Sequence, residues 1–116
     1  RVYQFRHGRV IFAGRSGAYG RLVIIRTTRG GDVWYAHLSQ IRKIVRVGKK
    51  LQSGTVIGNV GSSGHVTGPH LHLEVRRNDY PVNPAAFLWG KFRGNIYKMK
   101  IPSWTHSDRV MHLSDL

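Results

Sequence analysis

Two histidines and a glutamate stand at alternate positions in the stretch "GPHLHLEV", residues 68–75. Side chains of a β-strand alternate between its two faces, so a strand here would place His70, His72 and Glu74 together on one face. Two imidazoles and a carboxylate within a few ångströms of each other are typical of a metal site or an acid/base site. The alternative is an ordinary solvated sheet face, because a short motif is only a hypothesis until its context is known.

The surrounding segments predict a mainly β domain that could hold such a face. Short apolar and β-branched runs are separated by turns that use many of the 14 glycines of the chain. The expected strands are 9–13, 21–26, 32–38, 55–61 and 71–77. Strands at this spacing favour an antiparallel sheet or a barrel-like domain. We expect Leu71, Leu73 and Val75 to face its core, and residues 38–45 to form no more than one helical turn.

Charge is the strongest signal in the composition. The 116 residues include 19 Lys and Arg against 5 Asp and Glu, which gives a formal net charge of +14. This excess is spread along the chain and predicts an anionic partner, for which cell-wall polymer, acidic lipid and nucleic acid all qualify. The absence of cysteine excludes disulfides and thiolate ligands, so a bound metal would use nitrogen and oxygen. No apolar run approaches the ~18 residues of a membrane span.

Three segments, in the same order, resemble the lysostaphin-type (LytM-like) zinc endopeptidases that cut peptide cross-links in bacterial peptidoglycan. The segments are "GAYGRLVIIR" (17–26), "WYAHLSQI" (34–41) and the run from "VGKKLQSG" to "PVNP" (47–84), which contains "GPHLHLEV". The resemblance implies an antiparallel, barrel-like domain of the duplicated hybrid motif type, with zinc as its cofactor. It also implies a place in the bacterial cell envelope, periplasmic or extracellular.

The resemblance further implies roles for individual residues. His72 matches the zinc ligand of the family's H-x-H motif, while His37 and His70 match its two catalytic histidines. We expect Glu74 to orient the imidazole of His72 rather than to bind metal itself. In such a site zinc activates a water molecule and polarises the scissile carbonyl, and neutral imidazoles move the proton to the leaving amine.

Two more zinc ligands of the family, the His and Asp of an H-x-x-x-D motif, are expected upstream of "RVYQFRHGRVIFAG" and have no match in this chain. We therefore expect an N-terminally truncated domain that neither holds zinc nor cuts alone, completed by an upstream segment or a partner chain. Other side chains could substitute, but no spacing among them dictates a tetrahedral site; they are His65, Glu74, His106, Asp108 and His112. We expect His7 and His65 at the surface.

Two other functions remain open. One is a degenerate relative that has lost its metal and serves as a peptidoglycan-binding or regulatory module. The other is a phosphocarrier, because sugar phosphotransferase proteins share a related barrel. The presence of His37, His70 and His72 favours the peptidase over the degenerate module, and the "GPHLH" run, which the phosphocarrier pattern lacks, favours it over the phosphocarrier.

The domain boundaries and the partner complete the expectations. Residues 1–88 are expected to form the partial peptidase domain, and residues 89–116 a basic and aromatic C-terminal extension. The expected partner is peptidoglycan or another anionic cell-envelope polymer, with no specific nucleic acid and no transmembrane segment.

Overall fold

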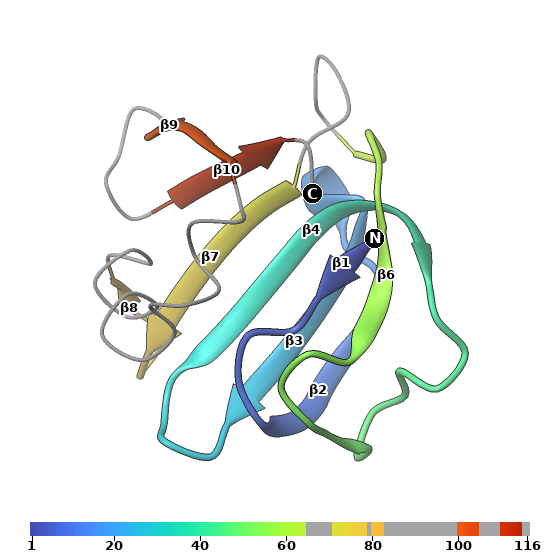
Figure 1. Cartoon of the computed structure of the whole chain (residues 1–116), viewed down its shortest axis with the longest axis vertical. Helices are drawn as coiled ribbons and strands as arrows, with labels where there is room; N and C mark the ends of the chain where they lie inside the picture. Colours follow the sequence, from blue (N-terminus) through green and yellow to red (C-terminus); the bar gives the residue numbers. More distant parts are fainter. Residues whose placement is uncertain (65–70, 79, 83–99, 105–109, 115–116) are drawn as a thin grey trace.

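The computed structural model describes residues 1–64, 71–78, 80–82, 100–104 and 110–114 (Figure 1). Within these ranges the regular structure is a set of strands and one short 3₁₀ turn, η1 (Gly17–Tyr19). The strands are β1 (Val2–Tyr3), β2 (Gly8–Arg15), β3 (Arg21–Thr27), β4 (Asp32–Ile41), β5 (Lys50–Leu51), β6 (Val56–Val60), β7 (Leu71–Arg77), β8 (Tyr80–Val82), β9 (Lys100–Trp104) and β10 (Val110–Ser114). The mainly β fold class is thereby confirmed.

All the strands belong to one sheet, in which every described pairing is antiparallel. The order is β5-β2-β3-β4-β7-β10-β9, with β6 beside β1 and β4, and β8 beside β7. Figure 1 shows β3, β4 and β7 running side by side, with β6 beside one end of β4 and β1 beside β6. The long strand β4 is therefore the centre of the sheet, because it pairs with β3, β7 and β6 along different parts of its length.

The main core lies on one face of the sheet. Leu71, Leu73 and Val75 are fully buried there, which confirms the alternation predicted for this strand. Tyr35 packs beside them, and its hydroxyl accepts a hydrogen bond from the backbone N–H of Phe5 at 3.0 Å. This bond gives a partner to the buried Phe5 amide. It also ties the loop that follows β1 to Tyr35 in the core.

The opposite face of β3 and β4 carries a second, smaller apolar cluster. Leu22, Ile24 and Ala36 are buried in it, and partly buried aromatic and aliphatic side chains pack around them. Those partly buried side chains are Ile11, Phe12, Tyr19 and Trp34. The centre of the sheet is thus covered on both faces, and this second face is the one that His72 and Glu74 share.

The helical turn considered for residues 38–45 does not form. Residues up to Ile41 continue β4, and the backbone N–H of Arg42 then bonds to the carbonyl of Ile57 at 2.9 Å. A single turn follows, closed by the N–H of Val45 on the carbonyl of Arg42 at 3.0 Å. Pairing with the neighbouring strand has taken the backbone groups that a helix would have used.

Part of the expected C-terminal extension continues the sheet. Strand β10 pairs with β7 so that the backbone of His112 lies opposite that of His72. The division of the chain at residue 88 stays a prediction. Among the described residues, the structure contains no helix that is long and apolar enough to cross a membrane.

Candidate functional site

Strand β7 places His72 and Glu74 on the second face of the sheet, opposite two residues of β4. His72 lies across from Ala36, and Glu74 lies across from Trp34. Neither side chain is widely solvated: 14% of His72 and 7% of Glu74 is exposed. The alternative of an ordinary solvated sheet face is therefore wrong for these two residues.

Glu74 is held by three neighbours. Its Oε1 accepts a hydrogen bond from His72 Nε2 at 2.7 Å and one from the Tyr19 hydroxyl at 3.2 Å. Its Oε2 accepts two bonds from the Arg76 guanidinium, at 3.0 and 2.9 Å. Burial alone would raise the pKa of the Glu74 carboxyl, but the bonds from His72 and Arg76 outweigh it and hold that pKa below its usual value.

An ionised carboxylate can only accept hydrogen bonds, which fixes the tautomer of its partner. The proton of His72 lies on Nε2, and in the neutral ring the lone pair lies on Nδ1. A histidine that binds metal usually donates its other ring N–H to such a carboxylate, which orients the ring and raises its basicity. The pair thus has the geometry expected of an oriented metal-binding imidazole.

Aromatic rings and an arginine form the wall beside this pair. The Arg76 guanidinium stacks 3.9 Å from the ring centre of Trp34, and its Nη2 also donates to the Tyr19 hydroxyl at 3.0 Å. Tyr19 lies 5.3 Å from Trp34 and meets His72 edge-on, with 5.7 Å between ring centres. These contacts lock the rotamers of Glu74 and Arg76 in a largely desolvated setting.

A β-bulge in β4 turns His37 toward the same place. Simple alternation would put His37 on the core face with Tyr35, but its φ is +61°, a value that few residues other than glycine adopt. The pairing of β3 with β4 shifts there, because Arg21 lies opposite Leu38 whereas Val23 lies opposite Tyr35. The extra residue re-aims the imidazole. The rings of His37 and His72 consequently meet at 90° with 5.3 Å between their centres.

The loop after β6 holds His37 in this orientation. The carbonyl of Ser63 accepts a hydrogen bond from His37 Nδ1 at 2.7 Å. The Ser63 hydroxyl donates to the carbonyl of Leu38 at 2.5 Å and accepts the N–H of Arg21 at 3.0 Å. Because a carbonyl is only an acceptor, the proton of His37 lies on Nδ1, and Nε2 is the basic nitrogen of the neutral ring.

Glycines allow this loop to lie against η1. A Cβ on Gly20 would stand 2.4 Å from the carbonyl carbon of Ser63, and one on Gly64 would stand 2.4 Å from the carbonyl oxygen of Ala18. Both glycines also have positive φ, at +67° and +81°. The backbones can approach this closely only where no side chain intervenes.

The structure brings together three of the four residues predicted from the sequence: His37, His72 and Glu74. His70 lies outside the described residues, as do His65, His106 and Asp108. His7 is exposed, as expected. Sequence reasoning missed Tyr19, Ser63 and Arg76. The signal for Arg76 was present, because it continues the i, i+2 spacing of His72 and Glu74, whereas Tyr19 and Ser63 reach the site through long-range contacts.

The described residues alone do not fit a zinc ion. The described ranges hold no group of three His, Cys, Asp or Glu side chains placed to bind a metal. Glu74 is not a spare ligand, since both of its oxygens are bound by His72, Tyr19 and Arg76. A structural or catalytic zinc site needs at least three protein ligands, and the described residues do not bring three together. The role of His72 as a ligand stays a prediction.

Curated proteins with similar sequences include peptidoglycan DD-endopeptidases and a DD-carboxypeptidase/endopeptidase. The DD-carboxypeptidase/endopeptidase Mpg of Neisseria meningitidis serogroup B is 47% identical over 79 residues, which are 68% of this chain and 18% of that protein. The peptidoglycan DD-endopeptidase ShyC of Vibrio cholerae is 40% identical over 65 residues, or 56% of this chain and 14% of that protein. The chain thus spans only a small part of the length of these relatives.

Solved structures agree with the sequence comparisons. The catalytic domain of lysostaphin from Staphylococcus simulans matches 75% of this chain and 68% of that chain, with a TM-score of 0.68 and 33% identity. A zinc-containing peptidase from Vibrio cholerae matches 66% of this chain and 23% of that chain, with a TM-score of 0.61 and 32% identity. The sequence profile of peptidase family M23 matches residues 1–84. The resemblance read from the sequence is confirmed, and the chain belongs to peptidase family M23.

Proposed function

We propose that this chain is part of a zinc-dependent endopeptidase that cuts peptide cross-links of peptidoglycan in the bacterial cell envelope. His72 is its metal ligand among the described residues, and Glu74 orients that ligand. His37 and His70 are the histidines that move protons. The remaining zinc ligands come from outside the described residues.

One observation carries this proposal: the backbone of His37 adopts a strained, left-handed conformation that brings its ring to His72. A residue other than glycine in the left-handed region costs about 1–3 kcal/mol, and such strain clusters at functional sites. In this conformation the His37 imidazole stands edge-on to His72, and its Nδ1 donates a hydrogen bond to the Ser63 carbonyl. A neutral imidazole whose basic Nε2 is fixed in this way is suited to take a proton and return it to a leaving amine.

The burial of the site supports the same assignment. The Glu74 carboxylate lies against Arg76, Tyr19 and Trp34, so the ring of His72 is held from one side. A ligand oriented in this manner loses little conformational freedom when it binds metal. A module that only binds the wall has no chemical need for two oriented histidines at this spacing.

The test is peptidoglycan cleavage by the full-length protein and two variants of β4. His37→Ala should slow release of peptide products by about 100-fold or more, because a positioned acid/base contributes at least that much. It should leave bound zinc unchanged. Gln40→Ala, an exposed position farther along the same strand, is the matched control and should cleave as the unaltered protein does.

The alternative is a wall-binding module of the same fold that has lost catalysis. It is favoured by one observation, the lack of a three-ligand group among the described residues. That function predicts no product release by the full-length protein at any zinc concentration. Cleavage that persists undiminished in His37→Ala would instead contradict the role given to this histidine.

A further inference from the structure

A row of cationic side chains crosses the sheet on the same face as His72. Arg9 of β2 lies directly opposite Lys50 of β5 on one side and Arg26 of β3 on the other. Arg26 in turn lies opposite Asp32, and Asp32 opposite Arg76. Their neighbours in sequence, such as Val10, Ile25 and Leu51, face the core, so the row must lie on the opposite face, that of His72.

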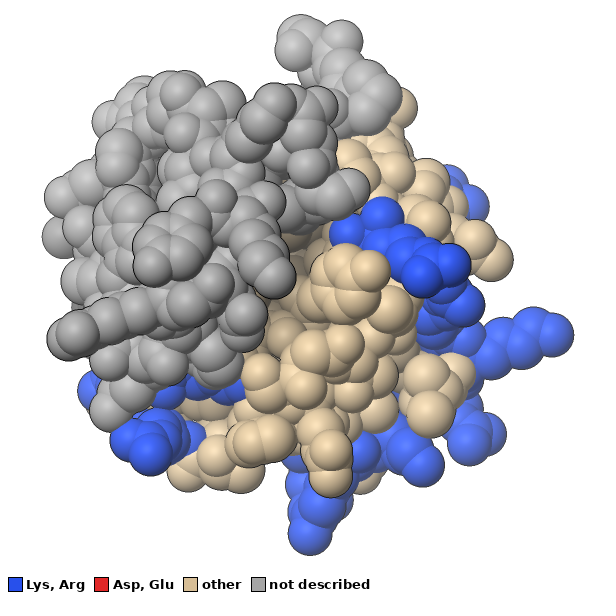
Figure 2. Space-filling model, viewed as in Figure 1, with Lys and Arg blue, Asp and Glu red and all other residues tan. Residues whose placement is uncertain are grey.

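This row of cations destabilises the folded sheet. Like charges directly opposite each other in an antiparallel sheet are destabilising, and the row contains two such pairs in succession. Among the described carboxylates, Asp32 is bound to Arg26 through both oxygens, at 3.0 and 3.1 Å, and Glu74 is bound to Arg76. Asp32 thus offsets the charge of Arg26, whereas no ion pair among the described residues involves Arg9 or Lys50. On the one face that Figure 2 shows, the described part of the surface carries many Lys and Arg side chains and no acidic one.

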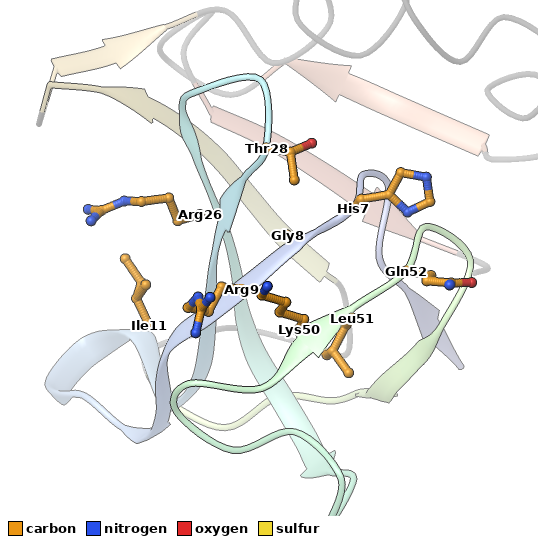
Figure 3. A pocket seen from close by; sticks show the side chains of 9 residues that line it. All are labelled: His7, Gly8, Arg9, Ile11, Arg26, Thr28, Lys50, Leu51 and Gln52. Carbon is orange, nitrogen blue, oxygen red and sulfur yellow. The ribbon is translucent and has the colours of Figure 1, made fainter.

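The row borders a hollow of about 750 Å³ between β2, β3 and β5. Figure 3 shows the side chains that line it, which are His7, Gly8, Arg9, Ile11, Arg26, Thr28, Lys50, Leu51 and Gln52. No carboxylate is among them. The backbone N–H of Ser53 donates to His7 Nδ1 at 3.0 Å, so the neutral ring carries its proton on Nε2 and is a donor there. The hollow therefore presents hydrogen-bond donors from β2, β3 and β5 and from the loops beside them.

We propose that this hollow binds the phosphate groups of a flexible phosphodiester polymer, at a site separate from the histidines. A tetrahedral phosphate offers acceptors in several directions, which suits donors that converge from different strands better than a planar carboxylate does. Neighbouring strands lie about 4.8 Å apart, so the row from Lys50 through Arg9 to Arg26, which is paired with Asp32, spans roughly 10 Å. That is the width of a single polymer strand rather than of a duplex. Binding here would hold the wall against the sheet face that carries His37 and His72.

The test uses the full-length protein and a synthetic glycerol phosphate oligomer, with affinity measured by calorimetry at low salt. Arg9→Gln with Lys50→Gln should weaken binding about tenfold, or about 1.4 kcal/mol. Arg42→Gln with Lys43→Gln removes the same net charge from exposed positions away from the hollow and is the matched control. We expect that control to lose no more than about twofold, because isolated surface charges act weakly.

Two further probes identify the ligand class. Polyglutamate of equal charge and a short DNA duplex should both bind more weakly than the oligomer. Equal losses in the two double variants would show that net charge alone attracts the polymer, and would overturn the proposal. So would tighter binding of polyglutamate or duplex, or no binding of the oligomer. None of these readouts involves cleavage, so this proposal and the peptidase function fail independently.

Folding provides a separate check on the Arg9→Gln and Lys50→Gln variant. Removing like charges that face each other should leave its melting temperature unchanged or slightly raised. A clear fall in melting temperature would mean that these side chains support the sheet rather than a ligand, and would contradict the proposal.

Discussion

Replacing Gly20 by alanine should damage the candidate site, whereas the same change at Gly17 should not. Gly20 has φ +67° and ψ −136°, a region open almost only to glycine, and its Cβ would stand 2.4 Å from the backbone of Ser63. The strain costs about 2 kcal/mol. Displacing Ser63 loosens three hydrogen bonds at about 1 kcal/mol each. Together these give a loss of ~5 kcal/mol in the free energy of unfolding.

Gly17 lies three residues earlier and makes the matched comparison. Its φ is +49°, but a Cβ there would meet nothing within 4 Å, so alanine costs only the left-handed strain of about 1–2 kcal/mol. Urea denaturation of both variants measures the difference, and imidazole NMR reports whether His37 Nδ1 keeps its hydrogen-bonded proton. We expect that signal to be lost in Gly20→Ala and retained in Gly17→Ala. Equal stability of the two variants would refute the reasoning that Ser63 holds His37 in place.

Three further predictions concern the core, the surface and the metal. Tyr35→Phe removes the acceptor of the buried Phe5 amide and should cost about 1–3 kcal/mol in urea denaturation. Burial raises the pKa of the Tyr35 phenol, so the unfolded chain loses this proton at about pH 10 while the folded chain keeps it, and stability should fall above that pH. That fall should be smaller in Tyr35→Phe; an identical alkaline profile would contradict the assignment. Binding to purified cell wall should weaken between low and high salt, and binding that is insensitive to salt would exclude electrostatic attraction. The 116-residue chain by itself should hold less than one zinc per chain in mass spectrometry, because His72 alone does not retain the ion against water.

The alternation of apolar and polar residues along the strands was enough to predict most of the fold. The alternation of Leu71, Leu73 and Val75 with His72 and Glu74 was readable because a strand has a fixed period of two, and the structure keeps it. The segment from 38 to 45 was harder to interpret. Its apolar spacing suits a helical turn as well as a strand, and only pairing with β6 decides between them.

The position of His37 could not be derived from local pattern. Alternation places it in the core beside Tyr35, and only the bulge opposite Leu22 turns it toward His72. The family resemblance pointed to this residue, but the means of reaching the site is a tertiary effect. Likewise, Ser63 acts mainly through its backbone carbonyl, an atom that every residue has, so no residue type could signal it.

The cationic row was visible in the sequence only as an excess of charge. The +14 balance predicted an anionic partner but no location for it. The registers of β5, β2 and β3 are needed to place Lys50, Arg9 and Arg26 opposite one another. Antiparallel register depends on turn lengths and bulges across distant segments, which a short sequence window does not contain.

Zinc content and peptidoglycan cleavage, measured together on the full-length protein and its His72→Ala variant, test the central claim most directly. We expect the unaltered protein to hold one zinc per chain and to release peptide products. We expect His72→Ala to lose both the metal and the cleavage, because an open zinc site with one of three protein ligands removed no longer retains the ion. A His72→Ala protein that keeps one zinc and cuts at the original rate would contradict the claim that this imidazole is a metal ligand.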